Sequence, residues 1–483
     1  AAGTPAVPAR AARTGAAGRL GDRATQVEKV DTIRWDAAMG DEPGDVDSLV
    51  AQAEAEVDAL QGQQLSEAVV GDRSGMARLV TRMIEDARAQ GASDIHIEQG
   101  NPSSVVRFRI DGDLRNYLVL PTRLRAALVS RIKVMARLDI AERRRPQDGR
   151  INMADFGQAR LELRVAVLPT HDSMENVVMR LLATSDPIPL NKLGLQKRDE
   201  ETIARLARYS FGLVLAAGPT GSGKTTTLHS ALAFINRPER KIWTAEDPIE
   251  ITQPGLRQVQ VNAKIDLTFA RALRAFLRAD PDVIMVGEIR DEETANIAVE
   301  ASLTGHLVMS TLHTNSAAET VTRLLDMGLD PFNFGDALLA VLAQRLVRRL
   351  CSSCVSARDA KPDEVDELLA DHLHVSQGVE GAPGPDQVLE GWRRRFGMDG
   401  RLRLFSADGC SKCDNSGYRG RAGVHELLQM SSPLRKLIQT GARAEEIRRL
   451  AQGEGMATLR QDGIEKVWAG VTTTDEVRAI SNS

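Results

Sequence analysis

Gly218-Pro219-Thr220-Gly221-Ser222-Gly223-Lys224-Thr225 fits the phosphate-binding pattern GxxxxGK[ST] at every fixed position. An apolar run precedes it, and helix-forming residues follow from Thr226 to Phe234. In this order of strand, glycine turn and helix, the N–H groups of the turn point at one phosphate group. Lys224 then reaches the β- and γ-phosphates, and the hydroxyl of Thr225 holds Mg²⁺. The stretch through Thr226 therefore predicts an ATP and Mg²⁺ site; the alternative is a glycine-rich turn without a ligand.

The length and composition indicate a globular protein of two or more domains. The chain has 483 residues, of which 42% are hydrophobic and 27% charged. No run approaches the roughly 18 apolar residues that cross a bilayer, and residues 1–21 lack the apolar core of a secretory signal. A net charge of -4 and only 4% aromatic residues argue against a nucleic-acid partner.

The first 73 residues predict a disordered or acidic linker. Residues 1–30 are rich in Ala, Gly, Arg and Pro, which favours disorder. The stretch 36–72 holds ten acidic residues and no Lys or Arg. We expect a solvated linker there, with a docking tail for a basic partner as the alternative. Within it, Leu49, Val50, Val57 and Leu60 share one face of a helix over 49–60.

Residues 74–184 predict a small α+β domain, because strands and helices occur without regular alternation. Apolar residues recur at helical spacing over 76–89, and Asp111-Gly112 forms a tight turn after a strand. The other elements expected here are strands at 94–98, 105–110, 160–168 and 175–182 and a helix at 123–138. Prolines mark 185–195 as a hinge linker.

Strands and helices alternate after the linker, which predicts an α/β fold with a parallel sheet covered on both faces. We assign residues 196–344 to this ATPase core, 345–420 to a cysteine-bearing subdomain and 421–483 to a C-terminal helical subdomain. The strands expected in the core are 213–217, 242–245, 283–286 and 307–311.

Carboxylates follow two of these strands. Glu288 comes directly after the apolar run 283–286, and Glu246 and Glu250 lie at the end of strand 242–245. Ligand groups gather at the carboxyl ends of parallel strands. We therefore expect Glu288 near Mg²⁺ and the γ-phosphate, and Glu250 or Glu246 as the base that orients water. A core strand with a solvated tip and an acidic surface turn are the alternatives.

Two histidines and two arginines are further candidates. His306 and His313 flank the strand 307–311 and could sense the γ-phosphate or a subunit boundary. Arg164 and Arg180 lie in the α+β domain, and a neighbouring subunit often supplies an arginine to phosphoryl transfer. The alternatives are hydrogen-bonded core histidines and solvated arginines. The same expectation of an exposed face or a subunit contact applies to a set of three arginines, Arg345, Arg348 and Arg349.

Two CxxC pairs contain all four cysteines of the chain. Cys351 and Cys354 form the first pair, and Cys410 and Cys413 form the second. Each pair can supply two corners of a tetrahedral Zn²⁺ site. The 55 residues between the pairs exceed the usual spacing, but a longer loop costs little closure entropy. We expect structural Zn²⁺, with four reduced thiols as the alternative.

The order of motifs resembles the secretion ATPase superfamily, the hexameric motors of type II secretion and type IV pilus assembly. The resemblance covers about residues 76–480, and two stretches, 341–351 and 417–427, are most similar to the type II secretion branch, with pilus extension ATPases next. The motifs that carry it are Ala92-Ser-Asp-Ile-His-Ile-Glu98, Pro146-Gln-Asp-Gly-Arg150, the glycine loop, Glu246-Asp-Pro-Ile-Glu250, Val286-Gly-Glu-Ile-Arg-Asp291 and Thr304-Gly-His-Leu-Val-Met-Ser-Thr-Leu-His-Thr-Asn315.

This resemblance implies a RecA-like core behind a PAS-like domain, with Arg164 and Arg180 facing the nucleotide of an adjoining site. It implies a Mg²⁺-dependent ATPase that forms a homo-hexamer and drives pseudopilus assembly and protein export. It places the chain in the cytoplasm, bound to the bacterial inner membrane through platform proteins. Rival hypotheses are a pilus extension ATPase, a nucleic-acid motor and a nucleotide-regulated binding module. Residues 1–75 depart from the family pattern, so docking to the platform is not explained by them.

Overall fold

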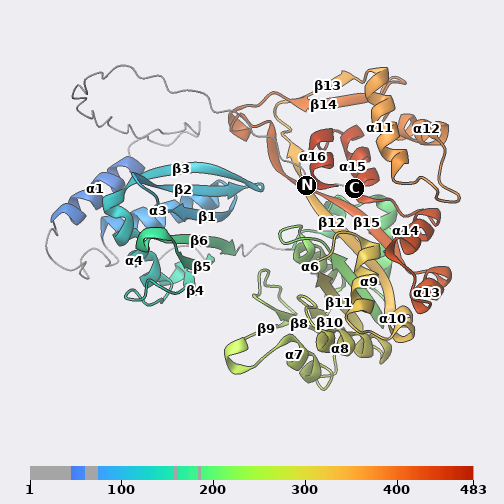
Figure 1. The fold of residues 1–483 in the computed structure, drawn as a ribbon, viewed down its shortest axis with the longest axis horizontal. Helices are drawn as coiled ribbons and strands as arrows, with labels where there is room; N and C mark the ends of the chain where they lie inside the picture. The colour runs from blue at the N-terminus through green and yellow to red at the C-terminus, as the bar shows by residue number, and fades with distance from the viewer. Residues whose placement is uncertain (1–44, 60–73, 157–160, 183–186, 482–483) are drawn as a thin grey trace, which may run out of the picture.

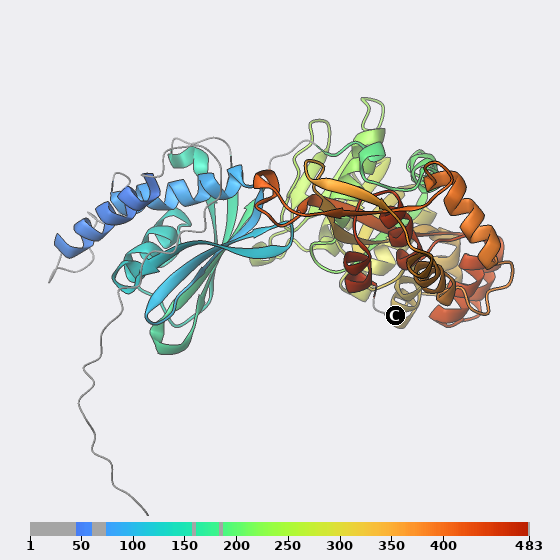
Figure 2. The same cartoon turned by 90° about the horizontal axis from the view of Figure 1, so that it is seen from above.

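A computed structural model describes residues 45–59, 74–156, 161–182 and 187–481 of the chain, which form two lobes (Figures 1 and 2). The predicted disorder of residues 1–30 and the first part of the hinge linker lie outside the described residues. The N-terminal lobe is shown in blue and teal in Figure 1, and the larger lobe runs from green to red. Of the helices described, none is both long enough and apolar enough to pass through a bilayer.

The N-terminal lobe is an antiparallel sheet with two helices packed on it. The strand order is β3-β2-β1-β6-β5-β4. Helix α3 begins after Ser74, whose hydroxyl accepts a hydrogen bond from Ala77 N, and it buries the apolar stripe that the spacing predicted. The elements are α3 (Gly75–Ala89), β1 (Ala92–Glu98), β2 (Ser103–Ile110), β3 (Asp113–Pro121), α4 (Arg125–Met135), β4 (Gln147–Asn152), β5 (Glu162–Pro169) and β6 (Glu175–Leu182).

Two strands of this lobe were not predicted. β3 and β4 are the edge strands of the sheet, and β4 buries only Ile151 completely among its six residues. β4 has polar residues at most positions, so it lacks the alternation that marks a strand in sequence. β3 follows the predicted turn and has an apolar run over 117–120 that was not assigned.

Helix α1 (Asp45–Ala59) packs against α3, so part of the acidic stretch is folded. The predicted helix is confirmed, but the expectation of a solvated linker is wrong for these residues. Ala53 is completely buried, Gly75 N donates to Glu56 Oε2 at 2.7 Å, and Arg123 pairs with Glu54 at 2.7 Å. The acidic side chains thus cap the next helix and neutralise an arginine.

The larger lobe contains a seven-stranded sheet in the order β15-β12-β7-β11-β10-β8-β9. All neighbouring strands are parallel except β12 and β15, so the predicted α/β fold is confirmed. The strands are β7 (Gly212–Ala217), β8 (Ile242–Glu246), β9 (Arg257–Gln260), β10 (Val283–Val286), β11 (Leu307–Leu312), β12 (Leu338–Leu350) and β15 (Tyr418–Gln429).

Helices cover both faces of this sheet. In β7, Leu213 and Leu215 face one apolar cluster while Ala216 faces the other, as strand alternation requires. One face carries α5 (Lys197–Leu206) and α6 (Lys224–Ile235), and the other carries α7 (Phe269–Phe276), α8 (Glu292–Leu303), α9 (Ala317–Asp326) and α10 (Pro331–Ala337).

The cysteine-bearing segment is a long excursion between two strands of the core sheet. β12 continues through the expected boundary at residue 344, and β15 continues through that at residue 420. Trp392 of this segment packs on Trp468 of the C-terminal helices, with ring centroids 5.4 Å apart. The elements are β13 (Val355–Asp359), α11 (Pro362–His374), α12 (Pro385–Phe396) and β14 (Arg403–Ala407), followed after β15 by α13 (Ser432–Gln439), α14 (Ala444–Gly453), α15 (Leu459–Trp468) and α16 (Thr474–Ile480).

Candidate functional site

The glycine loop connects the carboxyl end of β7 to the start of α6. Gly218, Gly221 and Gly223 have φ values of 151°, 79° and 86°, a region in which only glycine is unstrained. α6 begins at Lys224, and no side chain among the described residues caps it. Its first N–H groups are therefore available to an anion. Ser222 Oγ is buried and has no hydrogen-bond partner in the described part of the chain, so the loop fits a phosphate ligand.

Lys224 lies folded over this loop. Its Nζ donates to the carbonyl oxygens of Gly218 and Pro219 at 2.8 and 2.9 Å, and the residue is 7% exposed. Burial lowers the pKa of Lys224 to about 8; Arg345 adds to the lowering, and Glu288 opposes it. Thr225 is partly exposed on the first turn of α6.

Glu288 follows β10, two strands from β7, and β11 lies between them. Its Oε2 is 3.2 Å from His313 Nε2, and its Oε1 accepts a hydrogen bond from Arg290. His313 follows the end of β11 and is exposed. The structure therefore brings Glu288, His313 and the glycine loop to one edge of the sheet, where the carboxyl ends of parallel strands meet.

Glu246 is the last residue of β8, and Glu250 lies four residues beyond it in different surroundings. Glu246 is 2% exposed, and its oxygens accept hydrogen bonds from Thr244, Gln258 and His229 at 2.6, 2.9 and 3.0 Å. Burial alone would raise the pKa of Glu246, but these bonds lower it on balance. Because both of its oxygens already accept hydrogen bonds from protein groups, Glu246 is not free to orient a water molecule. It stabilises the turn after β8.

Glu250 is open to solvent and acts on Lys224 through its charge. Surrounding protein atoms raise the pKa of Glu250, and the positive charge of Arg180 opposes that rise. Of the two glutamates, Glu246 is buried and Glu250 is exposed.

Arg180 and Arg164 stand side by side on β6 and β5 of the N-terminal lobe. Arg180 Nε donates to Asp94 Oδ1 at 2.9 Å, and its charge reaches Glu250 of the same chain. Arg164 is exposed beside it. The resemblance implied that both arginines face the nucleotide of an adjoining site, and this stays a prediction.

His306 lies at the opposite edge of the sheet. It precedes β11, and its Nδ1 is 3.0 Å from the carbonyl oxygen of Ala301. β7 and β11 are parallel, with Leu307 beside Gly212 and Leu312 beside Ala217. The length of β11 therefore separates His306 from the glycine loop by roughly 20 Å. His306 is therefore too far from the glycine loop of its own chain to contact the γ-phosphate there, and the expected contact within one chain is wrong.

Gln344 on β12 touches the glycine loop and was not predicted. Its Nε2 donates to the carbonyl oxygen of Ser222 at 2.8 Å, and its Oε1 accepts from Thr227 Oγ1 at 2.7 Å. Its neighbour Arg345 bonds Asn315 rather than standing exposed. The available signal was a glutamine that directly follows the apolar run 338–343 and precedes an arginine.

Arg348 is also engaged, which leaves Arg349 as the exposed member of the three arginines. The guanidinium group of Arg348 stacks on Tyr418, with its Cζ 4.4 Å from the ring centroid, and donates twice to Glu476. It also reaches Asp113 of the N-terminal lobe at 2.5 Å. The expectation of an exposed face is therefore wrong for Arg345 and Arg348.

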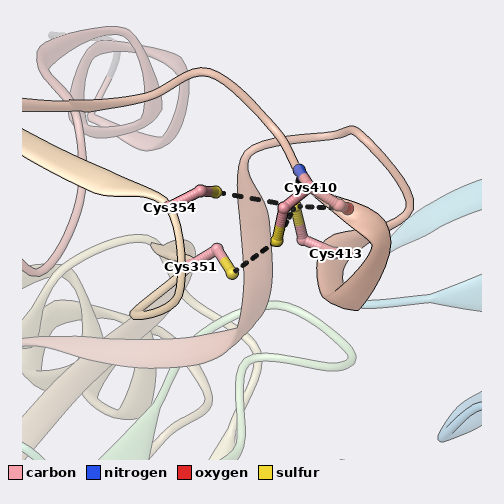
Figure 3. A group of neighbouring side chains, drawn as sticks. All are labelled: Cys351, Cys354, Cys410 and Cys413. Carbon is pink, nitrogen blue, oxygen red and sulfur yellow. Dashed lines mark hydrogen bonds between the residues drawn. The ribbon is translucent and has the colours of Figure 1, made fainter.

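The four cysteines converge from the two ends of the excursion (Figure 3). Their sulfur atoms all lie within 4.8 Å of one another, and three pairs are separated by 3.9, 3.8 and 3.7 Å. A tetrahedron with Zn–S bonds of about 2.3 Å has edges of about 3.8 Å. The donor set therefore fits Zn²⁺, and the loop length did not prevent the pairs from meeting.

The tip of the β2–β3 hairpin touches this cysteine subdomain. Gly420 N donates to Asp111 Oδ2 at 2.7 Å, and Arg115 pairs at 3.3 Å with Asp414, which follows the last cysteine. At the other end of the lobe, Arg150 Nη1 donates to Gln260 Oε1 at 3.1 Å. Hydrogen bonds from both sides thus hold the N-terminal lobe against the larger one.

Comparison with known proteins places this architecture in a family. The family described as "Type II/IV secretion system protein" matches residues 70–479. The chain is 43% identical over 458 residues to "Type II secretion system ATPase E" of Vibrio cholerae, which covers 95% of this chain and 84% of that protein. It is 47% identical over 411 residues to "Type II secretion system protein E" of Pseudomonas aeruginosa, covering 85% and 76%. "Type IV pilus assembly ATPase PilB" of Thermus thermophilus is 45% identical over 410 residues, covering 84% and 43%.

Solved structures agree on the fold. The pilus retraction motor PilT with bound ADP aligns with a TM-score of 0.55 at 25% identity, covering 84% of this chain and 97% of PilT. The ATPase DotB of Legionella pneumophila aligns with a TM-score of 0.58 at 22% identity, covering 83% and 95%. With its glycine loop, its parallel core sheet and its cysteine cluster, the chain belongs to the type II/IV secretion system protein family.

Proposed function

We propose that this chain is the Mg²⁺-dependent ATPase motor of a type II secretion system, which drives pseudopilus assembly and protein export. The observation that carries the proposal is the convergence of Lys224, Glu288 and Glu250 on one sheet edge. Identities of 43–47% to type II secretion ATPases support the same function. The pilus ATPase PilB, at 45% identity, keeps pilus extension as the second candidate.

In this proposal the glycine loop binds the phosphates of ATP. Backbone N–H groups of residues 220–226 surround the phosphate oxygens, and Lys224 leaves its two carbonyl partners to bind the β- and γ-phosphates. Thr225 and Glu288 would hold Mg²⁺, which would neutralise phosphate charge.

Glu250 and Arg180 complete the proposed site. Glu250 has a raised pKa and few partners, so it suits the role of a base that orients the attacking water. Arg180 offsets negative charge that develops in the transition state, and its bond to Asp94 fixes its direction. Arg164 stands next to it and suits the same task, in this chain or across a subunit boundary.

The motor requires movement between the lobes and assembly into a ring. We propose that residues 185–195 act as the hinge and that six copies form the working unit at the cytoplasmic face of the inner membrane, held there by platform proteins. The bonds Asp111–Gly420 and Arg150–Gln260 are the contacts that such a movement would break.

Phosphate release and mass measurement test this proposal. The purified chain should release phosphate from ATP only with Mg²⁺, and nucleotide should favour a particle of six times the 52.5 kDa chain mass in light scattering. Deletion of the gene should leave exported proteins inside the cell while pili persist. Loss of pili with normal export would instead assign the chain to pilus extension.

We further propose Zn²⁺ at Cys351, Cys354, Cys410 and Cys413. The protein should carry about one zinc per chain by metal analysis, and a Cys351→Ser and Cys410→Ser double variant should lose it and melt at a lower temperature. Ser411→Ala, between the second pair of cysteines, is a matched control. Zinc-free protein with four freely reactive thiols would contradict this site.

A further inference from the structure

We propose that Gln344 and Arg345 are positioning residues that tie the glycine loop to the loop after β11. The inference rests on the proposed nucleotide site and adds two residues to it. It starts from their place on β12, which pairs with β7 up to Ala343 and Ala217 and then continues beside the glycine loop. Neighbouring side chains on a strand point to opposite faces, so these two residues serve two different loops.

Gln344 determines the shape of the glycine loop. It is 4% exposed, and it bonds the carbonyl oxygen of Ser222 and the hydroxyl of Thr227 on either side of Lys224. A Cβ added at Gly223 would lie 2.7 Å from Gln344 Nε2, and one at Gly218 would lie 2.5 Å from the Gln344 carbonyl oxygen. Because Gly218 and Gly223 have no side chains, Gln344 can pack directly against the glycine loop.

Arg345 holds the loop that carries His313. Its Nη2 donates to Asn315 Oδ1 at 3.0 Å and to the Asn315 carbonyl oxygen at 3.3 Å. Asn315 N donates in turn to Glu319 Oε2 at 3.0 Å, which fixes the start of α9. His313, two residues earlier, contacts Glu288. A shift of Arg345 therefore moves the residue next to the proposed Mg²⁺ ligand.

The two residues should have separable effects, because Gln344 bonds the glycine loop and Arg345 bonds the loop after β11. Gln344 supports the loop that binds every phosphate, so its loss weakens ADP and ATP alike. Arg345 supports His313 and Glu288, which face the γ-phosphate, so its loss slows turnover and spares ADP. A residue that merely stabilises the fold would lower ADP binding and ATP turnover together, in proportion to the unfolded fraction.

The experiment uses the full chain and measures binding of a fluorescent ADP, steady-state hydrolysis of ATP and thermal melting. We expect Gln344→Ala to raise the Kd for ADP about tenfold. We expect Arg345→Ala to keep that Kd within about twofold and to lower kcat about tenfold. Arg345→Lys has one ammonium nitrogen in place of the Nη1 that bonds the Gln344 backbone carbonyl and the Nη2 that bonds Asn315, so it should resemble Arg345→Ala. Arg349→Ala on the same strand is the control, and it should match the wild type.

Double variants keep the test decisive if one substitution destabilises the fold. Thr227→Val combined with Gln344→Ala, and Asn315→Ala combined with Arg345→Ala, should cost less than the sum of the single effects, because each pair shares one bond. Additive effects within both pairs, or Gln344 and Arg345 variants that behave like Arg349→Ala, would overturn the inference. A wild-type chain that binds ADP but hydrolyses no ATP would overturn the proposed function and leave the Gln344 arm intact.

Discussion

The two edges of the core sheet are built from the same strands but differ in chemistry. At the carboxyl edge lie the glycine loop, Glu288 and His313, with ion pairs and a lysine of lowered pKa. At the amino edge, His306 bonds a backbone carbonyl beside Phe211 and Leu303, which are 55% and 42% exposed. The two histidines lie at opposite ends of β11, so the direction of the strand decides which of them lies near the glycine loop.

The largest expected effect at the carboxyl edge is that of Lys224→Ala. Without the ammonium group the phosphates lose their main cation, and turnover should fall by at least about 10²–10³-fold. Melting should change little, because the Nζ bonds only two loop carbonyls. Phosphate release and circular dichroism check both statements, and turnover above a tenth of the wild-type rate would refute the site.

Glu288→Gln should give the next largest effect. The variant keeps the shape of the side chain but removes the charge that holds Mg²⁺ and pairs with Arg290 and His313. We expect kcat to fall about 10²-fold while ATP still binds within severalfold. Glu292→Gln, at the start of α8, is the matched control. Equal losses in both variants would show that overall charge, rather than the contacts of Glu288, matters.

These expectations also show what the sequence could and could not provide. The glycine loop, Glu288 and the four cysteines were predictable because their partners are set by local spacing or by strand direction. His306 was misplaced because it was assigned from its motif, although its position before the strand 307–311 of a parallel sheet puts it at the amino edge. Gln344 was missed because its bonds to Ser222 and Thr227 join residues more than a hundred positions apart. Contacts of that range appear only once the strands are paired.

The lowered pKa of Lys224 should produce a smaller effect, a gradual dependence of ADP affinity on pH. The pKa of Lys224 is about 8 in the folded chain, below the ordinary 10.5. Between pH 8 and 10.5 the unfolded chain therefore binds more protons than the folded chain. The free energy of unfolding of the unliganded protein thus increases as the pH rises through this range. Bound phosphates restore the protonated form, so binding takes up a proton. Affinity for ADP should therefore fall up to tenfold per pH unit above about 8.

Titration of ADP at several pH values in buffers of different ionisation enthalpy measures this uptake. Lys224→Arg remains charged throughout the range and should show weaker but pH-independent binding. A flat profile in the wild type would mean that Lys224 keeps its proton in the free protein.

The smallest expected effects separate the two histidines. His313→Ala removes a contact to Glu288 and should lower kcat about tenfold, because a hydrogen bond to a charged group contributes roughly 1.5–3 kcal/mol and this one is partly solvated. His306→Ala loses only a bond to the Ala301 carbonyl oxygen, so kcat of the single chain should stay within about twofold. Each variant should be measured below and above the concentration at which particles of six chains form. A loss in His306→Ala that appears only in those particles would assign this amino edge to a subunit boundary, whereas a loss at every concentration would mean that the two edges communicate through β11.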